Sequence, residues 1–265
     1  MFIISFGLAF APIVLLALLI AIVMHEIAHA WVAAWSGDLT AKFSKRTSLN
    51  PVRHFNWLGF LMLILVGFGF AKPVPVNVEN FRNKRKGTIL VSLAGVITNL
   101  LLALTSAFFL VIIERFGAFS GYGIHLYPAR IFNVSALSTI PQIATAVFAV
   151  FFGVMVQINV VLALFNLLPL FPLDGHRLME AGLGSFNKVV KFTRDWGMAV
   201  LLGLVGFDFV IGMLSVYLPN IMPFGLQLSL FSPLRLYMHF VGGGIAHSFM
   251  NLFRIMFGVT PIWPF

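Results

Sequence analysis

The residues His25, Glu26 and His29 form an H-E-x-x-H pattern inside a long apolar segment. On a helix, residues four positions apart share one face, so the two imidazoles can hold one Zn²⁺. The glutamate between them can act as general base on the water that the metal binds. Three ionisable side chains within five residues of an apolar span are costly to bury and are usually functional. The pattern therefore favours a catalytic zinc site over two histidines that are only hydrogen-bonded within a helix bundle.

A third metal ligand is needed, because catalytic zinc usually has three protein ligands. The chain has no cysteine, so the ligand must come from His, Asp, Glu or Asn. Asp174 follows a long apolar run that Pro169 and Pro172 interrupt, so it lies on an irregular backbone at the end of a predicted span. Taken alone, Asp174 is an ordinary turn residue at the membrane surface. Together with the two histidines it becomes the candidate third ligand.

These residues belong to a chain with the composition of a membrane protein. Of its 265 residues, 60% are hydrophobic and 9% are charged, and its mean hydropathy is +1.00. Soluble domains have about 25% charged residues, so a soluble globular enzyme is excluded. The outer loop between the second and third spans is too short for a separate soluble domain.

Four runs are long enough to cross a membrane, at about 8–35, 87–113, 143–168 and 196–218, the last interrupted by Asp208. The run 55–71 has 17 residues and three glycines, which favours a re-entrant segment. The tail after Pro219 fits either an interfacial helix or a fifth span. We therefore predict an all-α polytopic membrane protein with about four to five transmembrane helices, a re-entrant segment and a short extended, β-like loop.

The basic residues predict the orientation of these spans. Of the 17 lysines and arginines, nine lie between the first and second spans and four between the third and fourth. The positive-inside rule places both loops in the cytoplasm, with Met1 outside and the site toward the cytoplasmic side. The net charge of +9 thus marks membrane orientation, and we expect the bilayer as a partner but no nucleic acid.

Several motifs occur in order along the chain and together resemble the site-2 protease family, specifically its compact prokaryotic-type branch without PDZ or CBS domains. The resemblance covers roughly residues 20–178. It rests on His25-Glu26-Ile27-Ala28-His29, Gly37-Asp38, Asn50-Pro51-Val52-Arg53-His54, the run 68–77, Gly95-Val96-Ile97-Thr98-Asn99 and Asn166-x-x-Pro169-x-x-Pro172-Leu173-Asp174-Gly175.

The resemblance implies an intramembrane zinc metalloprotease with one Zn²⁺ per chain. His25, His29 and Asp174 would bind the metal, and Glu26 would activate the water. Asn166 and Asn99 are candidates to stabilise the oxyanion, although either could simply hydrogen-bond between helices. His176, two residues after Asp174, could compete as a ligand.

An extended segment follows the predicted re-entrant run. Its alternating prolines exclude a helix, because each proline fixes its own φ and restricts the residue before it. A transmembrane substrate must unwind before hydrolysis, and an extended edge could hold the unwound part by strand addition. The alternative is a surface loop that only anchors the re-entrant run. The segment consists of Lys72, Pro73, Val74, Pro75, Val76 and Asn77.

The leading hypothesis is a zinc endopeptidase that cleaves transmembrane protein substrates in a prokaryotic inner membrane. Residues 1–218 would form its core and residues 219–265 a C-terminal apolar tail, and the oligomeric state is left open. The alternatives are a zinc or ion transporter that uses the same site and an inactive membrane-binding protein. A glutamate between paired histidines favours hydrolysis, and no internal repeat of the kind common in transporters is visible.

Overall fold

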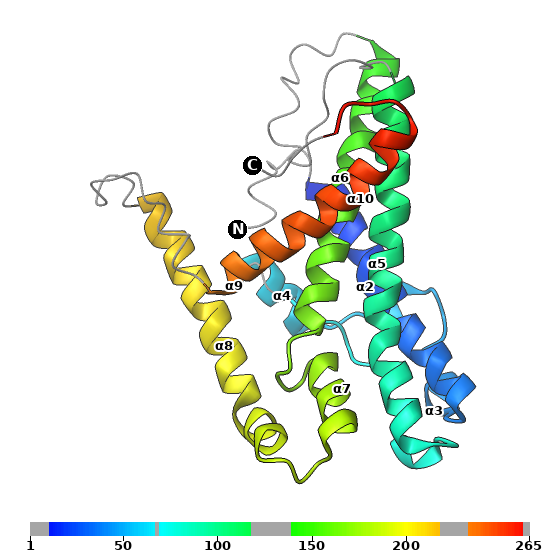
Figure 1. Cartoon of the computed structure of the whole chain (residues 1–265), viewed down its shortest axis with the longest axis vertical. Helices are drawn as coiled ribbons and strands as arrows, with labels where there is room; N and C mark the ends of the chain where they lie inside the picture. The colour runs from blue at the N-terminus through cyan, green and yellow to red at the C-terminus, as the bar shows by residue number, and fades with distance from the viewer. Residues whose placement is uncertain (1–10, 67–68, 118–138, 218–232, 262–265) are drawn as a thin grey trace.

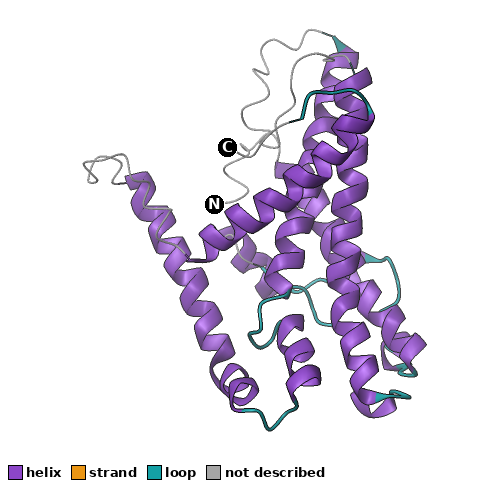
Figure 2. Cartoon of the chain, in the orientation of Figure 1, coloured by secondary structure: helices purple, strands orange, loops and turns teal. Residues whose placement is uncertain are grey.

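The computed structural model describes residues 11–66, 69–117, 139–217 and 233–261 (Figure 1). Helices joined by loops account for all of its regular structure, and no strand occurs within these four ranges (Figure 2). The predicted all-α class is therefore confirmed.

Three helices are long and apolar enough to cross a membrane: α2 (Ala11–Ser36), α5 (Lys84–Phe116) and α6 (Ile140–Asn166). They correspond to the first three predicted spans. The fourth predicted span lies within α8 (Lys188–Tyr217), except for residue 218, which is outside the described residues. Within the described residues, α8 is not among the three candidate membrane spans.

Local sequence signals fix where α5 and α6 begin. The side chain of Asn83 accepts a hydrogen bond from Lys86 N at 2.9 Å and so caps the first turn of α5. Thr139 and Gln142 form a capping box at the start of α6, with a proline in its first turn. Beyond Asn166, Pro169 prevents the helix from continuing.

The core lies between α2, α5 and α6. Small side chains allow close approach: Ala103 and Ala107 of α5 are fully buried against α6. On the other side of α6, Ala17 and Ala21 of α2 pack against a buried valine cluster of α6. The three helices thus form a tight bundle that fixes the rotation of each one.

The predicted re-entrant run folds back on itself. Its helical part is α4 (Trp57–Val66), and the chain returns so that Lys72 N donates to His54 O at 2.9 Å. The returning chain contacts α4 at Gly59, where a Cβ atom would lie only 1.9 Å from Phe70 O. The two ends of the segment thus lie side by side, as expected for a re-entrant segment.

The remaining elements flank the bundle. On the first loop are α3 (Thr40–Phe43), η2 (Pro51–Arg53) and η3 (Val78–Asn80), and α7 (Asp174–Leu183) follows α6. The tail contains α9 (Pro233–Tyr237), the π-helical turn η7 (Met238–Gly242) and α10 (Gly243–Met256), which packs against α5 and α6. In Figure 1, α8 stands to the left of the bundle and makes its main contacts with α7 and α9.

Candidate metal centre

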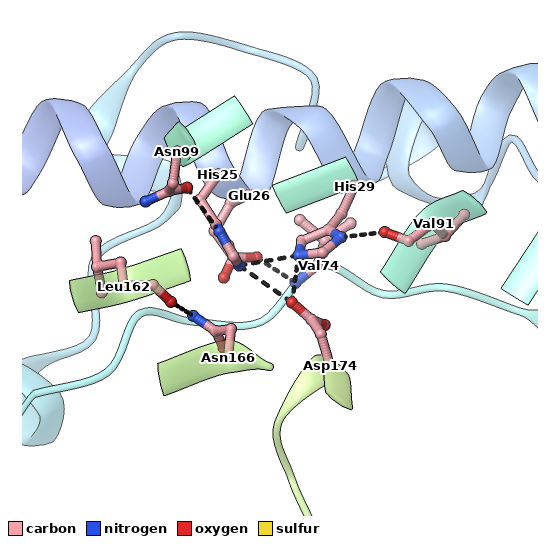
Figure 3. Close-up of polar contacts among 9 residues, drawn as sticks. All are labelled: His25, Glu26, His29, Val74, Val91, Asn99, Leu162, Asn166 and Asp174. Carbon is pink, nitrogen blue, oxygen red and sulfur yellow. Dashed lines mark hydrogen bonds and ion pairs between the residues drawn. The ribbon is translucent and has the colours of Figure 1, made fainter. Parts of the chain in front are cut away.

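Two histidines of α2 and the first residue of α7 converge at one point (Figure 3). The Nε2 atoms of His25 and His29 lie 3.0 Å apart. Asp174 Oδ2 lies 3.3 Å from Nε2 of His25 and 3.1 Å from Nε2 of His29. Both histidines are 7% exposed. The structure thus brings together the three side chains that the sequence predicted as ligands.

The chain between α6 and α7 carries Asp174 to the histidines. The loop turns tightly enough that a Cβ atom on Gly175 would lie 2.3 Å from Leu167 O. Only glycine allows the start of α7 to pack against the end of α6 in this way. The two prolines break the helix, and the glycine permits the return of the chain toward α2.

The hydrogen-bond partner of each Nδ1 atom fixes the tautomer of that imidazole. His29 Nδ1 lies 2.7 Å from Val91 O, a carbonyl that can only accept, so Nδ1 carries the proton. His25 Nδ1 lies 2.9 Å from Asn99 Oδ1 and donates to it in the same way. Both Nε2 atoms therefore present lone pairs to each other and to Asp174. Three acceptor atoms in contact repel unless a cation lies between them.

The spacing of these atoms fits zinc. Ligand atoms bound tetrahedrally at about 2.0–2.1 Å are about 3.3 Å from one another. The observed separations of 3.0, 3.1 and 3.3 Å are close to that value. Two imidazoles and one carboxylate are a common donor set for catalytic zinc.

The helix α5 approaches the histidines closely because it has Gly95 at the contact. A Cβ atom there would lie 2.4 Å from His25 Cε1 and 2.6 Å from His29 Nε2. The same helix supplies Val91 and Asn99, which face the two Nδ1 atoms. One face of α5 thus holds both imidazoles in place.

The carboxylate of Glu26 is held by the extended segment 72–77, which we call the strap. Val74 N donates to Glu26 Oε2 at 3.0 Å (Figure 3). Val74 is buried and packs with Ala30 of α2 and Ala41 of α3. The strap therefore lies directly against the side chain that the sequence predicted as general base.

The two candidate oxyanion residues lie in different surroundings. Asn99 is fully buried and turns its Oδ1 to His25, while its Nδ2 has no hydrogen-bond partner among the described residues. Asn166 Nδ2 donates to Leu162 O of its own helix at 3.0 Å (Figure 3). His176, which could compete as a ligand, instead contacts Thr193 Oγ1 at 3.1 Å and packs α7 on α8.

The sequence motifs did not identify three residues that support the site. Gly95 was noted only as part of a motif, and Arg46 only as a cytoplasmic charge. Asp38 is fully buried and accepts from Asn77 N at 2.7 Å, which ties the strap to the end of α2. Burial raises the pKa of Asp38, but hydrogen bonds from Thr40 and Asn80 outweigh it and lower the pKa. The Gly37-Asp38 pair was the only local signal for this anchor.

Comparisons with known proteins agree with this geometry. The family model described as peptidase family M50 matches residues 13–205, which include every candidate site residue. The chain is 39% identical over 176 residues to a Bacillus subtilis (strain 168) protein described as "Putative zinc metalloprotease YwhC". That alignment covers 66% of this chain and 71% of the relative. No solved structure matches the chain. The chain belongs to peptidase family M50, the site-2 protease family, and is a peptidase.

Proposed function

We propose that this peptidase is a zinc-dependent endopeptidase that hydrolyses peptide bonds within or near transmembrane segments of other proteins. One observation carries the proposal: the side chains of His25, His29 and Asp174 form a cluster that could hold a metal ion, and its two histidines flank Glu26 on a helix long enough to span a membrane. The name of the Bacillus relative, which mentions zinc, supports the choice of metal.

The depth of the site supports cleavage within the membrane. His29 is seven residues before Ser36, where α2 ends. At 1.5 Å per residue this is about 10 Å from the helix end, well inside a bilayer of about 30 Å. By the positive-inside rule, that end of α2 faces the cytoplasm, and we propose a prokaryotic inner membrane as the location.

We assign the residues the following roles. His25, His29 and Asp174 hold one zinc ion, which supplies a Lewis acid that acidifies water and polarises the scissile carbonyl. Glu26 accepts the proton of the attacking water and passes it to the leaving amine. Its Oε2 already accepts from Val74 N, so Oε1 is the oxygen suited to proton transfer.

The two asparagines receive different assignments. Asn166 is the last residue of α6, before the loop that leads to Asp174, and is the better candidate for a donor to the oxyanion. Asn99 orients His25 through Oδ1, and its buried Nδ2 is the only part left to face a reacting oxygen.

The strap is our proposed contact for the unwound substrate. It lies beside Glu26, so a substrate held along it would have its peptide bonds close to the general base. Prolines at 73 and 75 remove two backbone donors, which leaves Val74 and Val76 as its central N–H groups. The partners we expect are therefore transmembrane proteins presented through the lipid bilayer.

The substitution Glu26→Gln tests the mechanism, because it keeps the size of the side chain but removes the base. In proteoliposomes that contain a panel of tagged single-span proteins, we expect cleavage to fall at least about 100-fold, the scale of lost general-base catalysis. Zinc content, measured by mass spectrometry of the metal, should stay at the wild-type level. His29→Ala and Asp174→Ala should lose both zinc and cleavage.

Other results would contradict the proposal. Unchanged cleavage by Glu26→Gln would exclude Glu26 as the base, and full zinc content in both ligand variants would show that the ligands are misassigned. Cuts confined to soluble loops of the substrates would exclude cleavage within the membrane. Metal flux into proteoliposomes that depends on His25, with no cleavage, would favour the transporter instead.

A further inference from the structure

The guanidinium of Arg46 is buried, although the residue lies in the cytoplasmic loop between α2 and α4. Arg46 is 6% exposed, and its Nη2 donates to Lys72 O and, at 2.9 Å, to Pro73 O. Arginine is almost never fully buried unless it is paired, because removing its charge from water is costly. Among the residues that the structure describes, no carboxylate lies within ion-pair distance of it. The burial of this charged side chain without a paired carboxylate therefore needs a physical explanation.

The turn after α3 directs Arg46 inward. Lys45 adopts a left-handed φ of 55°, and Arg46 N donates to Ala41 O at 2.8 Å. This is the hydrogen-bond pattern that ends a helix and reverses the chain. The turn places Arg46 under the strap, while Lys42 of the same short helix is exposed to solvent.

A single peptide unit connects Arg46 to Glu26. Its carbonyl, Pro73 O, accepts from Arg46, and its N–H, on Val74, donates to Glu26 Oε2 at 3.0 Å. The peptide is planar and trans, so its carbonyl and N–H point in opposite directions and move together. A cation on the oxygen also polarises the unit and strengthens the hydrogen bond that its N–H donates.

The charges of the two side chains also interact. Burial lowers the pKa of Arg46, and the negative charge of Glu26 opposes that shift. Glu26 is thus the carboxylate whose charge favours the charged form of Arg46, and the Pro73–Val74 peptide lies between the two side chains. The strap is fixed elsewhere by other contacts, since Lys72 N donates to His54 O and Asn77 N to Asp38. Arg46 binds the carbonyls of Lys72 and Pro73, immediately before the N–H group of Val74 that contacts Glu26.

We propose that Arg46 is a positioning residue for Glu26: it holds the Pro73–Val74 peptide, whose N–H fixes one carboxylate oxygen and leaves the other aimed at the reacting water. This inference rests on the proposed role of Glu26 as general base. It predicts that loss of Arg46 impairs the chemical step without releasing the metal. A residue that only clamped the strap for substrate binding would affect KM instead.

The test compares Arg46→Ala, Arg46→Lys and Arg46→Gln with the matched control Lys42→Ala, which removes an exposed charge from the same loop. The full-length protein is assayed in proteoliposomes with the single-span substrate identified in the Glu26→Gln experiment. We expect Arg46→Ala to lower kcat by about 10- to 100-fold, because a misplacement of about 1 Å costs on this scale. KM should change less than about threefold, and zinc content should not change. Arg46→Lys, which keeps a charged donor, should recover part of kcat, and Lys42→Ala should resemble the wild type.

A second readout does not depend on activity. The strap has few backbone N–H groups because of its two prolines, so hydrogen exchange at Val74 can be resolved by mass spectrometry. We expect exchange at Val74 to become at least about tenfold faster in Arg46→Ala and in Glu26→Ala, but not in Lys42→Ala. Arg46→Lys and Arg46→Gln, which keep a donor, provide the same comparison if Arg46→Ala does not fold.

Several outcomes would overturn the inference. Wild-type kcat in Arg46→Ala, a change in KM alone, or unchanged exchange at Val74 would each do so. Loss of zinc in Arg46→Ala would show that the residue supports the metal centre rather than the base. Full activity of Glu26→Gln in the same preparations would instead refute the proposed function, so the two failures are distinguishable.

Discussion

The Nδ1 atoms of the two histidines determine which ring nitrogens can bind a metal. Val91 O and Asn99 Oδ1 each accept a hydrogen bond there, so both Nε2 atoms face Asp174 as acceptors. Partners of this kind typically contribute 10- to 100-fold to metal affinity. The chemistry of the site therefore depends on an amide 74 residues away from the histidine that it orients.

At the scale of single residues, Asn99→Ala separates two roles for the buried amide. It leaves His25 Nδ1 without its acceptor, so we expect zinc affinity to fall by about 10- to 100-fold. Competition with a chelator of known affinity measures this change. The control is Asn159→Ala, since Asn159 is also fully buried but donates to Met155 O of its own helix. Unchanged zinc affinity together with a lower kcat would instead support an oxyanion role for Asn99.

At the scale of elements, the contact between α5 and α2 decides whether the site can form. Both helices are long and apolar enough to span a membrane, and the imidazoles lie against the surface that Gly95 leaves open. The backbone of α5 thus forms one side of the metal centre. The loop that carries Asp174 closes it from the side of α7.

Gly95→Ala tests whether the close contact between α5 and the two histidines is needed for metal binding. Its Cβ atom would lie 2.4 Å from His25 Cε1, closer than atoms in contact can be, so an imidazole or the helix must move. We expect loss of zinc binding and of cleavage while the protein remains folded. Gly203→Ala on α8 is the matched control, because a Cβ atom there meets nothing within 4 Å. Normal zinc content in Gly95→Ala would show that α5 does not press on the histidines.

At the scale of the whole molecule, the C-terminal tail is joined to the bundle through a buried ion pair. Arg254 Nη1 of α10 lies 2.8 Å from Glu114 Oε2 near the end of α5, and the two side chains are only 3% and 4% exposed. Arg254 Nε also donates to Thr260 O at 2.6 Å. Ala246 and Met250 of α10 join the α5–α6 core beside this pair. The tail is thus packed into the same core as the helices that hold the site.

Arg254→Met should destabilise the fold, because it removes the cation that faces a buried carboxylate. Breaking one side of a buried pair typically costs about 3–5 kcal/mol, and thermal unfolding in detergent measures it. Arg115→Met is the control, since Arg115 is the exposed neighbour of Glu114. A melting temperature equal to that of the control would mean that the tail docks through its apolar contacts alone.

The sequence by itself determined the class of the protein and half of its site. A charged fraction of 9% and three long apolar runs are properties of composition and of consecutive residues, and the corresponding helices are present. The pairing of His25 with His29 also follows from helical periodicity alone. The fourth predicted span corresponds to most of α8, which is not among the three candidate spans found in the described residues. The tail has polar residues that recur at multiples of four positions, namely Arg235, His239, His247 and Asn251, and this pattern fits either an interfacial helix or a span.

Only the tertiary structure decided what surrounds the two histidines. Asp174 was proposed from its depth, but the contacts of Asn99 with His25 and of the Pro73–Val74 peptide with Arg46 and Glu26 join residues far apart in the chain. Each contact depends on the rotation of the helices about their axes and on the distances between them. Small residues such as Gly95 determine how closely the helices approach. Hydrophobic patterns encode which face of a helix is buried, but not which buried atom meets which. Packing of the whole bundle supplies that information.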